Sequence, residues 1–385
     1  MHIARSTGRH TGPMKLLRRI LKWSAAGVAV VFLILFLVIF VAYWRSNNEC
    51  GQAVTQGSTM KAIVYCDYGS PDLLKLEDVA IPVPAEDQVL VKVRAASVNP
   101  LDWHFLQGTP YIMRLDSGLR KPKRRQLGVD YSGVVEAVGS KVTQLKPGDE
   151  VFGAKGGAFA EYLCAKADRA MARKPSNISF EGAAAVPIAA ITALQGLRDA
   201  GKIQAGQQVL INGASGGVGT FAVQLARSFG AHVTGVCSGR NEPLVRSLGA
   251  EQVIDYKKED FTRSDRPYDL MLDNVGTQPM SGFRRVLKPK GICVLIGGGG
   301  PDEGRWIGPM SRPLKALLFR PFLSQKFTMI LADVNHKDLS FMADLMATGK
   351  VKPVIDRTYT LSQTPDALRY LEKGHARGKV VITMP

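Results

Sequence analysis

Four glycines lie within seven residues of the stretch NGASGGVGTFAVQLAR, residues 212–227. The run before them, QVLI, is short and apolar like a buried strand, and the run after them repeats apolar residues at helical spacing. Glycines between a strand and a helix permit a tight turn, the approach of a pyrophosphate and close packing of the helix. Amide groups at the helix N-terminus, together with its dipole, attract phosphate oxygens. The pattern predicts a dinucleotide site at Gly213, Ala214, Ser215, Gly216, Gly217, Val218 and Gly219.

The end of the next predicted strand, GVCSGRN at residues 235–241, bears on which dinucleotide binds. A site for the unphosphorylated ribose usually has Asp or Glu there, to accept a hydrogen bond from the 2′-hydroxyl. Here Cys237 and Ser238 hold that place and Arg240 follows. A hydroxyl and a guanidinium can bind a 2′-phosphate, which a carboxylate would repel. We therefore expect NADPH, with Ser238 and Arg240 at its 2′-phosphate; the alternative is that Arg240 is an ordinary solvated side chain.

Two patterns divide the chain around these residues. From residue 60 to about 187, alternation of apolar and polar residues, as in VLVKVRAASV, and a Pro-Gly turn signal favour β-strands. From about residue 188, short apolar strands alternate with helices. That alternation favours a parallel sheet covered on both faces. We expect an α/β fold in which a doubly wound parallel sheet positions the glycine-rich turn.

The stretch GQQVLINGASGGVGTFAVQLAR resembles the signature of the quinone oxidoreductases (zeta-crystallins), a zinc-free branch of the medium-chain dehydrogenase/reductase superfamily. AASVNPLDW, LGVDYSGVVEAVG, AAVPIAAITALQGL, LGAEQVIDY and LDNVG are similar to that family in the same order, so the resemblance covers residues 60–385. It implies a GroES-like catalytic domain around a Rossmann domain, with the cofactor between them. The expected parts are a first catalytic part at 60–187, a Rossmann NADP-binding domain at 188–325 and a second catalytic part at 326–385.

The resemblance also bears on zinc. The zinc alcohol dehydrogenases of the superfamily carry an early Cys and a Gly-His-Glu motif; this chain has SVNPLD and GVDYSG in those segments and lacks the four-cysteine lobe. A catalytic zinc needs three protein ligands of the Cys, His or carboxylate kind. His104 lies nearby, but a lone His is more often packed or hydrogen-bonded than a ligand. We expect no metal site.

Without a metal, the expected reaction is hydride transfer from the nicotinamide to a quinone ring or to an activated C=C or C=O group. Hydrogen-bond donors would stabilise the oxygen that gains charge. The resemblance implies that Asn99 and Asp102 of SVNPLD lie beside the nicotinamide, Thr192 along the cofactor, and Tyr256 and Asn274 at its adenosine and nicotinamide ends. We expect Asn99 and Asp102 to be catalytic, with Asn99 as the amide donor. The alternatives are that Asn99 fixes a turn and that Asp102 caps a helix.

Other functions fit the same scaffold. An enoyl-thioester or enone reductase and a zinc-free alcohol dehydrogenase are two alternatives, and a non-catalytic NADPH-binding redox sensor is a third of another class. No Ser-His-Asp set or carboxylate pair suggests hydrolysis, and no aromatic-basic stacking pattern suggests nucleic acid. We expect a quinone-like or enone-like small molecule as the partner, and a homodimer is one open form of assembly.

The N-terminal region has a different character. The first 46 residues hold seven basic residues and no acidic one, in a chain of formal net charge +17. Residues 23–44, WSAAGVAVVFLILFLVIFVAYW, carry no charge and would span roughly 30 Å as a helix, the thickness of a bilayer. A secretory signal peptide is the alternative, although its apolar core is usually about 7 to 15 residues and no small-x-small cleavage site closes this one. We expect a basic segment at 1–22, one transmembrane helix at 23–44 and a linker at 45–59.

The side of the membrane depends on two arguments that disagree. The positive-inside rule keeps the basic N-terminal flank in the cytoplasm and sends the following domain across the membrane. NADPH, however, is a cytosolic reductant. The five cysteines form no CxxC pair and predict neither a disulfide framework nor a zinc cluster; most are expected to be small apolar strand residues. We expect a single-pass membrane protein with its catalytic domain in the cytoplasm.

Overall fold

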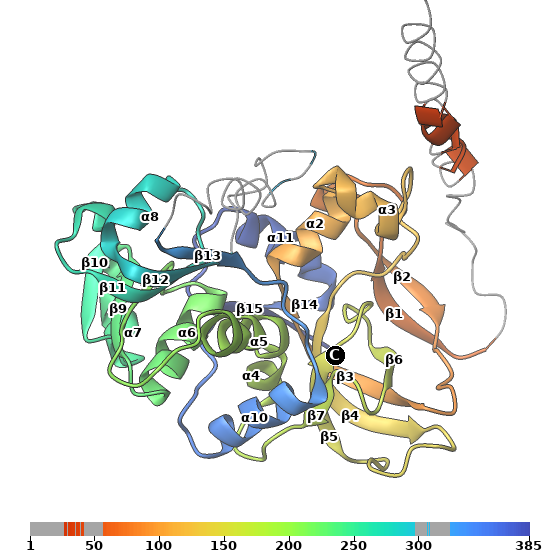
Figure 1. Cartoon of the computed structure of the whole chain (residues 1–385). Helices are drawn as coiled ribbons and strands as arrows, with labels where there is room; N and C mark the ends of the chain where they lie inside the picture. The colour runs from red at the N-terminus through yellow and green to blue at the C-terminus, as the bar shows by residue number, and fades with distance from the viewer. Residues whose placement is uncertain are drawn as a thin grey trace, which may run out of the picture.

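The computed structural model of the chain describes residues 57–296 and 324–385, with Trp306, Gly308 and residues 27, 28, 30–34, 36–38, 40 and 41. A six-stranded and a seven-stranded sheet lie side by side, and a two-stranded sheet flanks the larger one (Figure 1). The two large sheets correspond to the Rossmann and GroES-like parts of the predicted fold. Their arrangement confirms that part of the α/β prediction.

The six-stranded sheet is parallel throughout, in the order β10-β9-β8-β11-β12-β13. Its strands are β8 (Gln208–Asn212), β9 (His232–Cys237), β10 (Gln252–Asp255), β11 (Tyr268–Asp273), β12 (Leu287–Leu295) and β13 (Lys326–Met329). Along β8, Val209 and Ile211 pack into one hydrophobic cluster, while Leu210 packs into another. Since neighbouring side chains of a strand point to opposite faces, both faces of this sheet are covered, as in a doubly wound fold.

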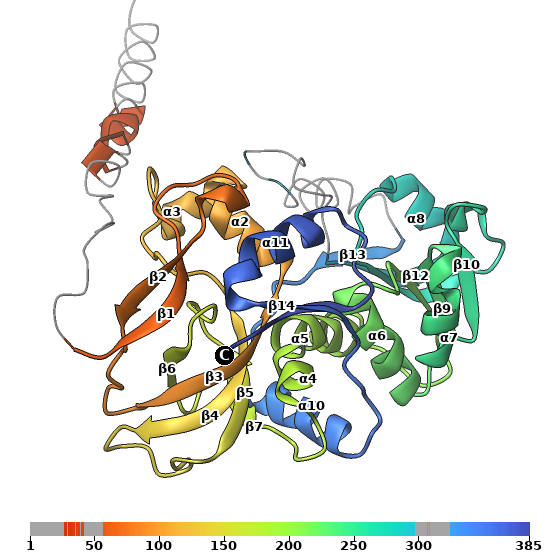
Figure 2. The ribbon, with the colours of Figure 1, turned by 180° about the vertical axis from the view of Figure 1, so that it is seen from behind.

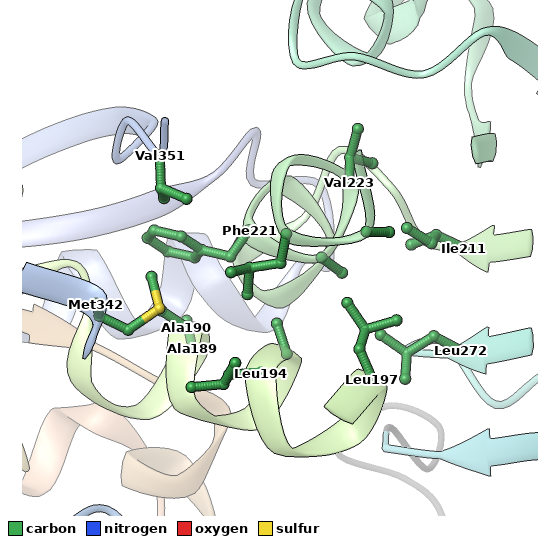
Figure 3. Close-up of a cluster of buried hydrophobic side chains, with 14 of the residues drawn as sticks. Ala189, Ala190, Leu194, Leu197, Ile211, Phe221, Val223, Leu272, Met342 and Val351 are labelled. Atoms are coloured by element: carbon green, nitrogen blue, oxygen red, sulfur yellow. The ribbon is translucent and has the colours of Figure 1, made fainter. Parts of the chain in front are cut away.

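The core on one face of this sheet includes side chains of α5 (Pro187–Gln195), α6 (Gly217–Ser228) and α10 (His336–Ala347). In Figure 3, Phe221 of α6 lies close to Val351 and to Met342 of α10, and all three side chains are fully buried. Leu194 and Leu197 continue the same cluster toward the strands. This packing fixes the start of α6, where the glycine-rich turn lies. The remaining helices of this part are α7 (Glu242–Ser247) and α8 (Met280–Val286).

The seven-stranded sheet has the order β14-β15-β3-β4-β5-β7, with β6 also paired to β3. Its strands are β3 (Gln88–Val98), β4 (Asp130–Val138), β5 (Glu150–Ala154), β6 (Tyr162–Lys166), β7 (Met171–Arg173), β14 (Ile355–Thr360) and β15 (Lys379–Thr383). Val380 of β15 lies opposite Val98 of β3, so the last residues of the chain complete a sheet begun near its start (Figure 2). The smaller elements are β1 (Thr59–Val64), β2 (Lys75–Ala80), α2 (Pro100–Gln107), α3 (Arg114–Ser117), α4 (Phe180–Ala184) and α11 (Thr364–Glu372).

One predicted boundary cuts through a sheet. Strand β13 pairs in parallel with β12, Ile292 opposite Lys326, and Leu339 and Met342 of α10 belong to the core of the six-stranded sheet. The Rossmann part therefore continues beyond residue 325, where the sequence analysis ended it. A four-residue edge strand carries too little pattern to be assigned to one sheet or the other. We propose a division between α10 and β14, where the chain returns to the catalytic sheet.

Most residues of the N-terminal predictions lie outside the described residues. This holds for all of 1–22 and nearly all of 45–59. Of the predicted transmembrane helix at 23–44, the described residues are helical, and Val31, Phe32 and Phe36 are more than half exposed. Within the part of the chain that the structure describes, no helix has the length and apolar character needed to cross a membrane.

The cysteines differ from the prediction at one position. Cys164 and Cys237 are free thiols in β6 and β9, and Cys293 is buried in β12, as expected of small strand residues. Cys66, in contrast, is disulfide-bonded. Sequence spacing did not predict this bond, because pairing depends on which residues the fold brings together.

Candidate functional site

The glycine-rich turn joins β8 to α6, as the sequence predicted, and two of its glycines serve the turn itself. Gly213 has φ 75°, a left-handed conformation that favours glycine. The amides of Gly213 and Ala214 donate to the Val236 carbonyl at 3.1 and 3.0 Å, which ties the turn to β9. A Cβ on Gly219 would stand 2.1 Å from the Gly213 carbonyl oxygen. Only glycine at 219 lets the first turn of α6 pack this closely on the loop.

The other two glycines face different neighbours. Gly216 is the N-cap of α6, and no side chain caps that helix. A Cβ on Gly216 would meet only the Gly213 oxygen, at 3.4 Å, so space beside this backbone is open. Bare amides of a helix N-terminus next to open space fit a pyrophosphate. A Cβ on Gly217 would instead stand 3.1 Å from Cδ of Lys379. The half-buried Val218 follows in the helix.

Two amide side chains next to the turn have incomplete hydrogen bonding. Asn241 Nδ2 donates to Ser215 Oγ at 2.9 Å, and Asn274 Nδ2 donates to the Asn212 carbonyl at 2.8 Å. The Oδ1 atoms of Asn241 and Asn274 are buried and accept no hydrogen bond from the described residues. Buried acceptors are normally satisfied, so these atoms fit a site that a bound molecule with hydroxyl or amide donors completes. Sequence reasoning selected Asn274 and missed Asn241.

The predicted 2′-phosphate residues follow β9. Ser238 is buried and Arg240 is exposed. A carboxylate from the next strand lies close by: a Cβ on Gly239 would stand 2.6 Å from Asp255 Oδ2. Burial, then Asp255 and a second nearby carboxylate, raise the pKa of Cys237 to about 11. A carboxylate thus lies next to the residue that precedes Arg240, and it was missed in the sequence because it belongs to another strand.

The remaining predicted cofactor residues lie on separate elements. Tyr256 follows β10, is half exposed, and its amide donates to the Cys237 carbonyl at 3.2 Å. Thr192 lies in α5 and is 8% exposed. Its Oγ1 donates to the Ile188 carbonyl at 2.6 Å, which leaves the oxygen lone pairs to accept from a ligand.

Asn99 and Asp102 belong to a buried polar cluster, which we define as Ser97, Asn99, Asp102, Asp130 and Lys379. Asn99 is the N-cap of α2, and its amide donates to Asp102 Oδ2 at 2.7 Å in a capping box. The two residues are 2% and 0% exposed. The Asp102 carboxylate therefore contributes to the start of α2.

The side-chain amide of Asn99 is directed into the cluster. Its Nδ2 donates to Asp130 Oδ2 at 2.9 Å and more weakly to the Ser97 carbonyl at 3.4 Å, and its Oδ1 accepts from Lys379 Nζ at 2.5 Å. Asp130 also accepts from Ser97 Oγ at 3.0 Å and from the Ile188 amide, at the start of α5, at 3.1 Å. Sequence reasoning missed Asp130 and Lys379. Each had one signal, namely a charged residue at the start of an apolar strand, in VDYSGVV and GKVVITM.

Burial controls the protonation of the cluster. It raises the pKa of Asp102 to about 7, and the neighbouring Asp130 adds to that rise, while the Asn99 amide and Lys379 oppose it. It also raises the pKa of Asp130 and lowers that of Lys379, since each charge loses its water. The 3.6 Å pairing of Lys379 Nζ with Asp130 Oδ2 opposes both of these shifts. The cluster can hold a proton on Asp102 near neutral pH.

The residues described around His104 fit a structural role for it. Its Nδ1 lies 2.8 Å from the Thr109 carbonyl, and burial lowers its pKa, which favours the neutral ring. Across residues 57–296 and 324–385, no group of three or more His, Cys, Asp or Glu side chains could hold a metal ion.

A doubly wound sheet with a glycine-rich turn, joined to a GroES-like sheet built from both ends of the chain, defines a medium-chain dehydrogenase/reductase. Residues 85–176 match the family described as alcohol dehydrogenase GroES-like domain, and residues 248–382 match that described as zinc-binding dehydrogenase. The mitochondrial NAD(P)H oxidoreductase RTN4IP1 of Bos taurus is 35% identical over 386 residues, which cover 89% of this chain and 96% of that protein.

Two further proteins indicate the branch of this superfamily to which the chain belongs. The chloroplastic NADPH-dependent alkenal/one oxidoreductase of Arabidopsis thaliana is 37% identical over 338 residues, 84% of this chain and 79% of that protein. The solved quinone oxidoreductase of Coxiella burnetii has a TM-score of 0.72 and 34% identity, over 85% of this chain and 100% of that one. The chain belongs to the quinone oxidoreductase-like branch of the medium-chain dehydrogenase/reductases.

Proposed function

We propose that the protein is an NADPH-dependent reductase that transfers a hydride to a quinone or to an activated C=C or C=O group. The observation that carries the proposal is the open, glycine-lined helix N-terminus at Gly216, with two unsatisfied amide oxygens beside it. Relatives named for NAD(P)H, alkenals and quinones support the same cofactor and substrate class.

NADPH would supply the hydride, and the chain would bind and orient it. The proposed binding residues are Thr192, Gly213, Ala214, Ser215, Gly216, Gly217, Val218, Gly219, Ser238, Arg240, Asn241, Tyr256 and Asn274. Because Asn99 and Asp102 are buried and bonded to each other, we propose that they support the nicotinamide site by fixing the junction of β3 and α2.

The test is NADPH oxidation by the full-length protein in detergent, against a quinone, an enone and an enoyl thioester. Turnover of quinone or enone is expected. Preference for the thioester would favour the enoyl-thioester reductase. Alcohol-dependent reduction of NADP would favour the zinc-free alcohol dehydrogenase. NADPH binding without turnover of any substrate would favour the redox sensor and reject the proposal.

The cofactor choice has its own test. If Arg240 binds the 2′-phosphate with Ser238, Arg240→Ala should weaken NADPH binding by about 1.5 to 3 kcal/mol, as for other charge-assisted hydrogen bonds. Titration calorimetry with NADH is the control, since NADH lacks the phosphate and should bind nearly unchanged. Equal weakening of both dinucleotides would remove Arg240 from the site.

We further propose that the reaction needs no zinc, as the residues in place of the zinc motifs suggest. Active protein should contain no stoichiometric zinc by elemental analysis, and a chelator should leave its rate unchanged. Inactivation by the chelator that zinc reverses would overturn this proposal.

Membrane attachment through residues 23–44 is also a proposal. Exposed side chains such as Val31, Phe32 and Phe36 support it, because apolar surface of this size is unfavourable in water. The need for NADPH favours a cytoplasmic catalytic domain, whereas the disulfide at Cys66 favours an oxidising compartment. Alkaline extraction tests attachment, and protease added to right-side-out vesicles tests the side. Sedimentation of the purified protein tests whether it is a homodimer.

A further inference from the structure

The start of strand β15 touches the glycine-rich turn directly. The Gly378 amide donates to the Ser215 carbonyl at 2.9 Å, and Gly378 forms an isolated parallel bridge with Gly216. Gly378 has φ 97°, so glycine lets the chain bend here just before β15 begins. The catalytic sheet and the dinucleotide turn are therefore joined by backbone at this point.

The next residue, Lys379, joins the same two parts with its side chain. Its Cδ packs against Gly217: a Cβ on Gly217 would stand 3.1 Å from it. Its Nζ donates to Asn99 Oδ1 at 2.5 Å and the Val98 carbonyl at 3.3 Å, at the end of β3. Asp130 Oδ2, at 3.6 Å, supplies the opposite charge. The stem supports the turn while the ammonium group is held in the catalytic domain, and Lys379 is only 3% exposed.

A buried ammonium group is costly unless it is paired and hydrogen-bonded, so the cluster holds Lys379 in one geometry. A long unbranched stem fixed at both ends leaves little freedom to the backbone above it. The space beside Gly217 that another side chain would occupy is filled by that stem. Any shift of the ammonium group must therefore move the stem or the turn.

We propose that Lys379 is a positioning residue that clamps the glycine-rich turn to the catalytic sheet and thereby sets the affinity for the dinucleotide pyrophosphate. The identity of the ligand rests on the proposed function, whereas the clamp itself is a property of the protein alone. The competing explanation is that Lys379 only neutralises Asp130 and stabilises the fold.

Substitutions that separate charge from position distinguish the two explanations. Lys379→Met keeps a long stem and removes the ammonium group, which leaves Asp130 buried without its cation. The double variant Lys379→Met/Asp130→Asn removes both charges, so most of the lost stability should return. Lys174→Met is the matched control: the Lys174 side chain is also only 5% exposed, its Nζ lies 2.9 Å from Glu150 Oε2, and its hydrogen bonds go to Pro175 and Ile178, away from the turn.

The first readout is amide hydrogen exchange of the full-length protein without cofactor, over residues 213–220 and 376–380. The global stabilities of the parent protein and the double variant are first matched with denaturant. We then expect exchange about tenfold faster in the double variant than in the parent protein. Lys174→Met should exchange at the parent rate. The second readout is NADPH affinity by calorimetry, expected to be about tenfold weaker in the double variant, which corresponds to roughly 1.4 kcal/mol.

Recovery of both exchange and affinity in the double variant would overturn the clamp, as would equal changes in Lys174→Met. If the parent protein binds no NADPH, the proposed function fails, while the exchange measurement still decides the clamp.

A pH series adds a signature of the ammonium group. Burial lowers the pKa of Lys379, and the charged groups that face it are Asp130 on β4 and Asp102 on α2. Deprotonation would release the clamp, so NADPH binding to the parent protein should weaken as the pH rises, at a pH below the ordinary lysine pKa. The double variant should lack this change. A parallel pH dependence in both proteins would contradict the proposal.

Discussion

The glycine-rich turn and the buried polar cluster meet at Lys379, but they are built in opposite ways. The turn consists of residues 213–219, has no charged side chain and has open space beside its backbone at Gly216. The cluster consists of side chains from β3, α2, β4 and β15, each nearly or fully buried. Backbone amides can stay open because their dipoles are small and solvent can satisfy them. Buried charges must be paired, since each loses its water.

The turn and the cluster therefore suit two different roles. An open backbone site can exchange a ligand without rearranging its neighbours, whereas a closed cluster resists movement because every shift breaks several hydrogen bonds. Asp130 illustrates the second case: it accepts from Ser97, Asn99 and the Ile188 amide, and it faces Lys379. It thereby joins β3, β4, α5 and β15. We infer that the cluster is the rigid reference against which the turn is held.

The largest expected effect tests that rigidity. Asp130→Ala leaves the Lys379 ammonium group buried without a counter-charge and should lower the free energy of unfolding by about 3 to 5 kcal/mol. Urea unfolding followed by circular dichroism measures it. The control is Asp78→Ala, which breaks the exposed ion pair with Lys61 and should cost less than about 1 kcal/mol. Similar losses in the two variants would mean that the cluster is no more rigid than the surface.

The second effect concerns the proton in the cluster. The pKa of Asp102 is about 7 in the folded protein, against an ordinary 3.8. Between roughly pH 4 and 7 the unfolded chain loses this proton and the folded one keeps it, so the free energy of unfolding falls as pH rises and then levels off. Asp102→Asn cannot ionise, so its stability relative to the parent should rise across this window, by about 1.4 kcal/mol for each step of one in pH. A pH-independent difference between the two proteins would show that Asp102 is already ionised.

The same contrast explains how much the sequence could predict. The turn is local: strand, glycines and helix follow one another within the 20 residues 208–227, so their order alone predicted the turn between β8 and α6. The cluster depends on Lys379 reaching Asn99 across 280 positions, which requires the pairing of β15 with β3. Asp255 beside Gly239 and the disulfide at Cys66 depend in the same way on contacts between separate segments.

The fold followed from periodicity for a similar reason. The alternation of strands and helices predicted the parallel sheet, because each element carries its own pattern. The extension of that sheet to β13 did not follow, since KFTM is short and its partner β12 ends about 30 residues earlier. The order of strands and helices along the chain was therefore predictable, and the pairing of a short strand with a distant one was not.

The third effect distinguishes a glycine of the turn that the fold needs from one that we expect only NADPH binding to need. Gly219→Ala places a Cβ 2.1 Å from the Gly213 oxygen and should destabilise the protein by about 1 to 3 kcal/mol, with or without cofactor. Gly216→Ala meets nothing closer than 3.4 Å, so the unfolding temperature should be unchanged, while NADPH binding should weaken about tenfold. Thermal unfolding and calorimetry on both variants test this. Unaltered NADPH binding in Gly216→Ala would place the pyrophosphate elsewhere.

The smallest expected effect concerns the carboxylate beside the predicted 2′-phosphate residues. Asp255 comes from β10, and its Oδ1 accepts from the Lys257 amide at 3.1 Å, which holds the carboxylate next to Gly239. A negative charge there should repel a 2′-phosphate, so Asp255→Asn should strengthen NADPH binding about threefold, roughly 0.7 kcal/mol, and leave NADH binding unchanged. The measurement is the ratio of the two dissociation constants at low and at high salt, because screening should reduce the gain. Arg240→Ala should move the same ratio in the opposite direction. If instead Asp255→Asn weakens NADH binding, the carboxylate holds a ribose hydroxyl, and this end of the site favours the unphosphorylated dinucleotide.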